Sequence, residues 1–134
     1  MKTILFVCVH NAGRSQMAEA IFNHQAAEAV IEARAASAGT LGGGNLNPNA
    51  VRAIEELGIS MEGQCPKQLT QEMASTADRI VSMGCGVDAD ACPARFIVTE
   101  DWGLDDPAGQ PIARVREIRD QIVKRVSELL KELS

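Results

Sequence analysis

The first 28 residues contain the feature that most constrains the fold. An apolar run at positions 3–7 leads into the loop segment 8–15, and a segment with helical spacing of apolar residues follows. The apolar run does not alternate with polar residues, so it predicts a central parallel strand over 3–8, covered on both faces. The next segment predicts a helix over 14–28. The chain therefore begins as strand, loop and helix.

The loop carries a thiol at its start, Cys8, and a guanidinium at its end, Arg14. A loop that closes onto a helix N-terminus offers unpaired backbone N–H groups and the positive end of the helix dipole. Arg14 adds a planar fork that can hold two oxygens. We expect Cys8, facing this positive potential, to be a thiolate near neutral pH. The pattern predicts a nucleophile in a cradle for a tetrahedral oxyanion. The cradle residues are Val9, His10, Asn11, Ala12, Gly13 and Arg14.

Three other side chains of this loop suggest roles. Ser15 can donate a hydrogen bond to the sulfur of Cys8 and hold it as a thiolate. Asn11 suits the left-handed backbone conformation, or a side chain that braces the loop. His10 could serve as a local base, but a histidine that faces the loop or the solvent explains it at least as well.

Periodicity and turn residues predict the remaining elements. Further strands are expected over 31–38, 79–83 and 95–99. One helix is expected to begin at Asn47 and Pro48, a cap residue followed by proline, and to close at Gly58. A short helix is expected over 71–76, followed near the C-terminus by a long helix. Its apolar residues are Val115, Ile118, Ile122, Val126, Leu129 and Leu133.

Side-chain directions follow from the same patterns. On the first helix Glu19, Asn23 and Gln25 are expected to face outward. On the second, Val51, Ile54 and Leu57 are expected to face inward. On the last, Arg116 with Asp120 and Asp120 with Lys124 form pairs four residues apart that can interact on the outside.

The order of strands and helices predicts a single α/β domain over 1–134, an open four-stranded parallel sheet with helices on both faces. In such sheets ligands bind beyond the carboxyl ends of the strands. The Cys8 loop, the segment around Cys85 and the loop around Asp106 each follow a strand, so we expect them to form one site.

Composition limits the possible partners. The chain of 134 residues has a net charge of −5, which argues against nucleic acid. No apolar run approaches the roughly 20 residues that span a bilayer. We expect a cytoplasmic protein, because polar residues follow the first apolar run at once and no cleavage-type site appears. Nothing in the sequence suggests an obligate assembly, so a monomer is expected.

Asp106 is the candidate proton donor. Attack on a tetrahedral oxyanion must expel hydroxide or alkoxide, which requires a proton from the opposite side. Asp105 is the competing residue, but Pro107 stiffens the chain directly after Asp106. The alternative is that both aspartates only form a turn.

The four cysteines indicate a redox role rather than structural disulfides. A metal site is not expected, because no close pair of the C-x-x-C type occurs. Cys85 and Cys92 lie in a segment rich in glycine and aspartate, which is an unsuitable core segment. With Cys8 they allow a relay of thiol–disulfide exchange, in which one thiol attacks, one resolves and one carries the oxidation outward. Cys65 fits no such step.

Together the loop from Cys8 to Ser15, the pair Cys85 and Cys92, and Asp106 with Pro107 resemble the thioredoxin-coupled arsenate reductases. That family shares the fold of the low-molecular-weight tyrosine phosphatases. The resemblance implies that the protein reduces arsenate in arsenic detoxification. Phosphate or sulfate would mimic the substrate, no cofactor would be bound, and thioredoxin would be the external reductant.

The family mechanism assigns an order to the thiols. Cys8 would attack arsenate held by Arg14 and the loop amides, while Asp106 protonates the departing oxygen. Cys85 would then attack Cys8, releasing arsenite and leaving a Cys8–Cys85 disulfide. Cys92 would attack Cys85, and thioredoxin would reduce the Cys85–Cys92 disulfide.

Departures from the family and competing functions remain. Some members bind potassium near the loop. Asn11 and Ser37 match that site in residue type, but Gln68 stands about where a carboxylate is needed, so we do not expect potassium dependence. A tyrosine phosphatase that uses Cys8, Arg14 and Asp106 is the main alternative, although the chain has no tyrosine to wall a phenyl ring. A thiol redox sensor without turnover is the third.

Overall fold

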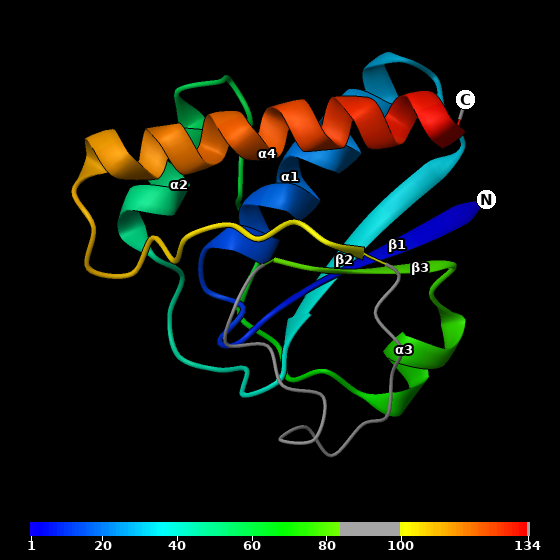
Figure 1. The fold of residues 1–134 in the computed structure, drawn as a ribbon, viewed down its shortest axis with the longest axis horizontal. Helices are drawn as coiled ribbons and strands as arrows, with labels where there is room; N and C mark the ends of the chain where they lie inside the picture. Colours follow the sequence, from blue (N-terminus) through cyan, green and yellow to red (C-terminus); the bar gives the residue numbers. More distant parts are fainter. Residues whose placement is uncertain (84–99, 134) are drawn as a thin grey trace.

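The computed structural model describes residues 1–83 and 100–133, and Figure 1 shows the fold. The elements in chain order are β1 (Lys2–Cys8), α1 (Arg14–Glu28), β2 (Ala33–Gly39), α2 (Pro48–Glu55), α3 (Gln71–Thr76), β3 (Arg79–Ser82), β4 (Glu100–Asp101) and α4 (Ile112–Leu133).

The four strands form one parallel sheet in the order β2-β1-β3-β4. The chain leaves β1 toward one edge and returns to pair β3 on the opposite side of β1. A crevice therefore opens at the carboxyl ends of β1 and β3, where parallel α/β sheets bind their ligands. The loop that begins after Cys8 lies at this switch point.

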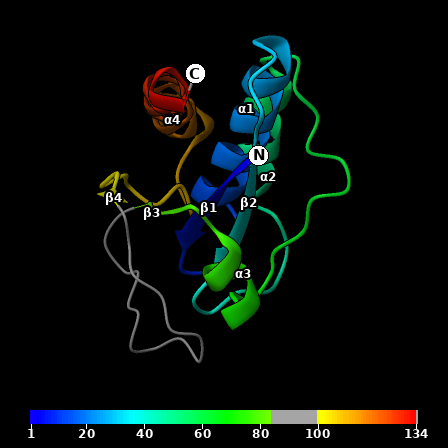
Figure 2. The ribbon, with the colours of Figure 1, turned by 90° about the vertical axis from the view of Figure 1, so that its right-hand side faces the viewer.

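Helices cover both faces of the sheet, which confirms the predicted fold class. Figures 1 and 2 show α1, α2 and α4 on one face and α3 on the other. Ile4, Phe6 and Cys8 of β1 belong to the core cluster beneath the three helices. Leu5 and Val7 belong to the smaller cluster on the α3 face. Alternate residues of β1 thus enter two cores, which explains its unbroken apolar run.

The larger core contains most of the few aromatic side chains. Phe6 packs edge-to-face against Phe22 of α1 with ring centroids 6.1 Å apart, and its centroid lies 5.2 Å from that of Trp102. All three rings are buried. Such contacts stabilise a core beyond the area they bury. Trp102 therefore serves packing in the core.

Several element boundaries differ from the sequence prediction, among them the end of α2, which lies at Glu55 rather than Gly58. β2 begins at Ala33 rather than 31, because Val30 is left-handed (φ 55°) and the N–H of Ile31 bonds to the carbonyl of Ala26 in the turn that closes α1. The predicted strand over 95–99 lies outside the described residues. β4 is described at Glu100–Asp101, paired with β3.

Some predicted side-chain directions are wrong. Leu57 is 40% exposed, because α2 ends at Glu55. Glu19 and Asn23 do not face open solvent: Glu19 accepts a hydrogen bond from Ser37 at 2.9 Å, and Asn23 bonds to the backbone of Ala35. Helical spacing identifies the face of a side chain, but it does not reveal the strand beside that face.

The expected pairs on α4 are also replaced by other partners. Arg116 bonds to Glu56, just after α2, and Arg119 bonds both to Glu56 and to its neighbour Asp120. A neighbouring helix thus offers Arg116 a better-placed carboxylate than the next turn of its own helix. Together these contacts join α2 to α4.

None of the helices within residues 1–83 and 100–133 combines the length and apolar character needed to cross a bilayer.

The Glu56 cluster predicts how stability depends on pH. Hydrogen bonds from Arg116 and Arg119, with the attraction of both guanidiniums, outweigh desolvation and lower the pKa of Glu56 from 4.5 to about 2. Because the pKa of Glu56 is lower in the folded state, the cluster stabilises the protein at pH values above the unfolded-state pKa. This contribution is lost as the pH falls from 4.5 through about 2.

We expect Glu56→Gln to lower the thermal midpoint modestly at neutral pH, with a difference from wild type that shrinks as the pH falls from 4.5 through about 2. Thermal unfolding followed by circular dichroism at several pH values measures it. A constant difference across the window would contradict the prediction.

Candidate active site

The end of β1 and the start of α1 build an anion cradle from backbone. β1 ends at Cys8, and α1 begins at Arg14 with Gly13 as its N-cap residue. No side chain caps the first amides of α1, and its first turn contains no acidic residue. Unpaired N–H groups at a helix N-terminus attract anions. The predicted strand–loop–helix arrangement therefore presents positive potential beside the thiol.

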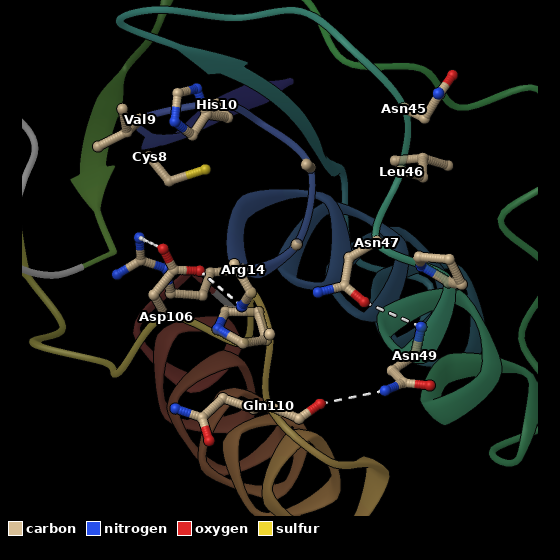
Figure 3. A pocket seen from close by; sticks show the side chains of 16 residues that line it. Cys8, Val9, His10, Arg14, Asn45, Leu46, Asn47, Asn49, Asp106 and Gln110 are labelled. Carbon is tan, nitrogen blue, oxygen red and sulfur yellow. Dashed lines mark hydrogen bonds and ion pairs between the residues drawn. The ribbon is translucent and has the colours of Figure 1, made fainter.

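Cys8 lies at the floor of a pocket of about 620 Å³. In Figure 3 its sulfur points into the space between Arg14 and Asp106 on one side and Asn47 on the other. The residue is only 3% exposed, and its sulfur lies 2.8 Å from Ser15 Oγ. The backbone N–H of Asn11 donates to the same sulfur at 3.2 Å. A backbone N–H and a hydroxyl group thus both contact the sulfur.

Asn11 braces the cradle from behind. Its backbone is left-handed (φ 58°) and its side chain is fully buried, which confirms both structural expectations for this residue. Nδ2 donates to Ser15 Oγ at 2.7 Å, while Oδ1 accepts from Gln16 Nε2 at 2.8 Å and from the N–H of Lys67 at 2.9 Å. One side chain thus joins the cradle, the first turn of α1 and the segment before α3.

Arg14 connects the cradle to the two segments opposite it. Its Nη1 donates to the carbonyls of Met83, at the end of β3, and Leu104, after β4, at 3.3 and 2.9 Å. Its Nη2 lies 3.9 Å from Asp106 Oδ2. The guanidinium is 4% exposed. Among the described residues backbone acceptors hold only Nη1, so Nη2 faces the Asp106 side of the pocket, where an oxyanion could bind it.

The two candidate aspartates point in different directions. Asp105 forms an ion pair with Arg114 at the start of α4. Asp106 lines the pocket and is 59% exposed, and its Oδ1 accepts the N–H of Ala108 at 2.9 Å in an aspartate turn. Pro107 packs against Gly13, where an added Cβ would lie 2.6 Å from the proline Cγ. The glycine of the cradle therefore lets the Asp106 loop approach closely.

The other cradle residues line the pocket rim. Val9, Ala12 and Gly13 contribute to its wall. His10 also lines it, but the residue is exposed and its Nδ1 lies 3.1 Å from the carbonyl of Leu41. This position agrees with the loop-facing interpretation of His10 better than with a base acting on Cys8.

The opposite wall was not predicted from the sequence. It contains Asn47, Asn49 and Gln110, which Figure 3 shows across the pocket from Cys8. Asn47 Oδ1 caps α2 by accepting the N–H groups of Asn49 and Ala50. Asn49 Nδ2 donates to the carbonyl of Gln110 at 3.2 Å, which ties α2 to the Asp106 loop. The capping signal at Asn47 was visible in the sequence, but its position beside Cys8 depends on tertiary packing.

The later cysteines separate into two groups. Cys85 and Cys92 lie outside the described residues. Cys65 is a free, exposed thiol, and it is not among the residues that line the pocket around Cys8. Its carbonyl accepts a hydrogen bond from Gln16. Within residues 1–83 and 100–133, no contact of its thiol suggests a role in the site.

Comparison with known proteins assigns the chain to a family. A family model described as low molecular weight phosphotyrosine protein phosphatase matches residues 3–134, and the chain belongs to this family. An arsenate reductase of Halalkalibacterium halodurans is 39% identical over 93% of this chain and 92% of its own length. A glutaredoxin arsenate reductase of Synechocystis is 33% identical over the full length of both chains.

Solved structures agree with this assignment. An arsenate reductase in the phosphate-binding state matches with a TM-score of 0.82 and 34% identity over the whole of both chains. A thioredoxin-dependent arsenate reductase of Corynebacterium glutamicum matches with a TM-score of 0.78 and 33% identity, covering 99% of this chain and 62% of that one. The resemblance inferred from the sequence is thereby confirmed.

The contact between Ser15 and Cys8 predicts a change in thiol reactivity. We expect Ser15→Ala to slow alkylation of Cys8 by iodoacetamide about ten-fold near pH 6, because a hydrogen bond to a charged group contributes about 1.5–3 kcal/mol. The rate at high pH, where any thiol is ionised, should change little. Labelling kinetics at several pH values measure this. Equal rates for Ser15→Ala and wild type near pH 6 would contradict the prediction.

Proposed function

We propose that this protein reduces arsenate to arsenite, with Cys8 as the nucleophile. The observation that carries the proposal is the buried Cys8 sulfur, which accepts the N–H of Asn11 and contacts Ser15 Oγ at the floor of a pocket that also contains Arg14 and Asp106. The similarity to arsenate reductases supports arsenate as the oxyanion. A tetrahedral oxyanion suits the amides of the cradle and the Nη2 of Arg14, which faces Asp106 at 3.9 Å.

The first step is nucleophilic substitution at arsenic. The thiolate of Cys8 forms a sulfur–arsenic bond as one arsenate oxygen departs, and Asp106 supplies the proton that lets it leave as water. The negative charge is held by Arg14 and by the first amides of α1. Arsenic remains in the +5 state in this adduct.

The second step is reduction. Cys85 attacks the Cys8 sulfur, a disulfide forms, and the electron pair of the sulfur–arsenic bond stays on arsenic, which departs as arsenite. Cys92 then attacks Cys85, freeing Cys8. Both residues lie outside the described part of the chain, so this step rests on the sequence and the family. In its support, Arg14 bonds to the carbonyl of Met83, which is two residues before Cys85.

Thioredoxin is the proposed external reductant for the Cys85–Cys92 disulfide. The pair of later thiols and the similarity to a thioredoxin-dependent arsenate reductase support this choice. The relative named glutaredoxin arsenate reductase makes glutaredoxin with glutathione the natural competitor. A protein dithiol exchanges with a disulfide in two steps and needs no bound cofactor.

Hydrolysis of phosphate monoesters is the alternative activity of the same site. The family model supports it, and Cys8, Arg14 and Asp106 would serve it equally. Among the described residues that line the pocket none is Phe, Tyr or Trp, and Trp102 is buried against Phe6. The imidazole of His10 is the one ring among them, so this part of the pocket offers little aromatic surface to a phenyl group, which favours a small oxyanion as substrate.

We also propose that no potassium ion is required. The carboxylate of Glu19, which stands behind the cradle, already has a cationic partner, since Lys67 Nζ lies 3.8 Å from its Oε1. Ser37 donates to the same oxygen. Replacing potassium with sodium in an arsenate turnover assay that follows NADPH consumption should leave the rate unchanged.

Turnover with thioredoxin, thioredoxin reductase and NADPH tests the relay. We expect arsenate-dependent NADPH consumption in wild type, and loss of at least about 100-fold in Cys8→Ser, Cys85→Ser and Cys92→Ser, because each removes a thiol that forms an obligatory bond. Cys65→Ser is the matched control and should behave as wild type. If Cys92→Ser still turns over, the three-thiol relay is wrong. If only glutaredoxin with glutathione supports turnover, thioredoxin is the wrong reductant. If only aryl phosphate reacts, the enzyme is a phosphatase.

A pair of aspartate variants tests the proton donor. Asp106→Asn should lower kcat for arsenate by about 10²–10⁴-fold, the usual contribution of a general acid. Asp105→Asn should change kcat by less than about two-fold, because it breaks only an exposed ion pair with Arg114. Steady-state kinetics of both variants measure the contrast. Equal losses in the two would indicate a role in loop structure rather than in proton transfer.

A further inference from the structure

A continuous chain of hydrogen bonds runs behind the cradle to the nucleophile. Gln64 Nε2 donates to Gln16 Oε1 at 2.6 Å, and Gln16 Nε2 donates to Asn11 Oδ1 at 2.8 Å. Asn11 Nδ2 reaches Ser15 Oγ at 2.7 Å, and Ser15 Oγ lies 2.8 Å from the Cys8 sulfur. The three middle members, Gln16, Asn11 and Ser15, are fully buried. Each bond is short, so each donor and acceptor is firmly placed.

Two backbone groups determine the direction of this chain. The N–H of Lys67 can only donate, so the Asn11 atom that faces it at 2.9 Å must be the carbonyl oxygen. The carbonyl of Cys65 can only accept, so the Gln16 atom 2.8 Å away must belong to the NH₂ group. These two contacts settle the orientation of both buried amides.

The orientation of the Asn11 amide determines which hydrogen bonds Ser15 accepts and donates. Because the NH₂ of Asn11 donates to Ser15 Oγ, that oxygen accepts, and the hydroxyl hydrogen is free to point at the Cys8 sulfur. The sulfur also receives the N–H of Asn11. Two donors converge on it, which suits a thiolate. If the Asn11 amide turned over, its oxygen would face Ser15 and would draw the hydroxyl hydrogen away from the sulfur.

Among the described residues, Gln16 is the side chain that donates to the oxygen of Asn11, and it shares that oxygen with the N–H of Lys67. It comes from the first turn of α1, is 0% exposed, and joins Asn11 to both Gln64 and Cys65. A buried amide must satisfy its polar atoms, so Gln16 can occupy this position only in one orientation. Its NH₂ group, together with the N–H of Lys67, presents two donors to the oxygen of Asn11 and restrains it from turning.

We propose that Gln16 is a positioning residue for the nucleophile: together with the N–H of Lys67 it holds the Asn11 amide in one orientation, which keeps Ser15 donating to Cys8. The proposal rests on Cys8 being the nucleophile of the proposed function. It does not depend on arsenate, on the later cysteines or on the identity of the reductant.

The charged and titratable groups near Cys8 must stay constant for a fair test. Among the described residues these are Arg14 and Asp106 in the pocket, His10 at the rim, and Glu19 with Lys67 behind the cradle. Replacing Gln16 with methionine removes its hydrogen bonds at similar length and adds no charge. A change in the alkylation rate of Cys8 then reports on the hydrogen-bond chain rather than on the electrostatic field of the charged groups nearby.

The experiment measures iodoacetamide alkylation of Cys8 over about pH 5–9, in a background where Cys65, Cys85 and Cys92 are serine. We expect Gln16→Met to slow alkylation about three- to ten-fold near pH 6 and to shift the pH profile upward, with an unchanged plateau at high pH. The matched control is Gln25→Met, on the same helix but bonded to Ser127, and its profile should equal the parent's. A variant that only loosened the fold would expose Cys8 and speed its alkylation, which is the opposite sign.

A second variant keeps the test decisive if Gln16→Met does not fold. Gln16→Leu also removes the donor to Asn11 and adds no charge, so it should likewise slow alkylation near pH 6; Gln25→Leu is its matched control. Profiles of the Gln16 variants that match their controls would overturn the proposal. Normal alkylation without arsenate turnover would instead reject the proposed function and leave the positioning role intact.

Discussion

The buried amide of Asn11 is the interaction on which the rest of the site depends. A left-handed residue in a loop is a local cost that surrounding contacts must offset. Here the Asn11 side chain donates one hydrogen bond to Ser15 and accepts two, from Gln16 and from the N–H of Lys67, and these bonds hold the loop in this conformation. The same conformation directs the Asn11 backbone N–H at the Cys8 sulfur. Structure and reactivity therefore share one set of contacts.

The sheet brings the remaining parts of the site to that loop. The order β2-β1-β3-β4 puts the ends of β1 and β3 beside each other, and Arg14 bridges from the cradle to Met83 and Leu104. Pro107 packs on Gly13 and brings Asp106 to the pocket. Cys8, Arg14 and Asp106 thus come from segments separated by up to about 100 residues in the chain, yet they meet at one crevice.

Much of this arrangement was predictable because its signals are local. Apolar spacing predicts α1 and α4, the cap at Asn47 predicts the start of α2, and the apolar run of β1 predicts a central strand. The partners of Arg116 and Glu19 were not predictable, since each bonds to a different element rather than within its own helix. Gln16 was missed for the same reason. The role of Gln16 depends on the backbone groups of Cys65 and Lys67, and the spacing of residues in the sequence cannot predict where these groups lie.

The sequence by itself determined the chemistry of the loop: a thiol, a guanidinium, a hydroxyl and an amide between a strand and a helix, which together define an oxyanion cradle. Only the tertiary structure decided where the individual side chains point. It turned Asp106 to the pocket and Asp105 to Arg114, placed Asn47 and Gln110 across from Cys8, and oriented the two buried amides behind it. The physical reason is that the residue type limits which bonds a side chain can form, whereas the fold decides which partner stands within reach.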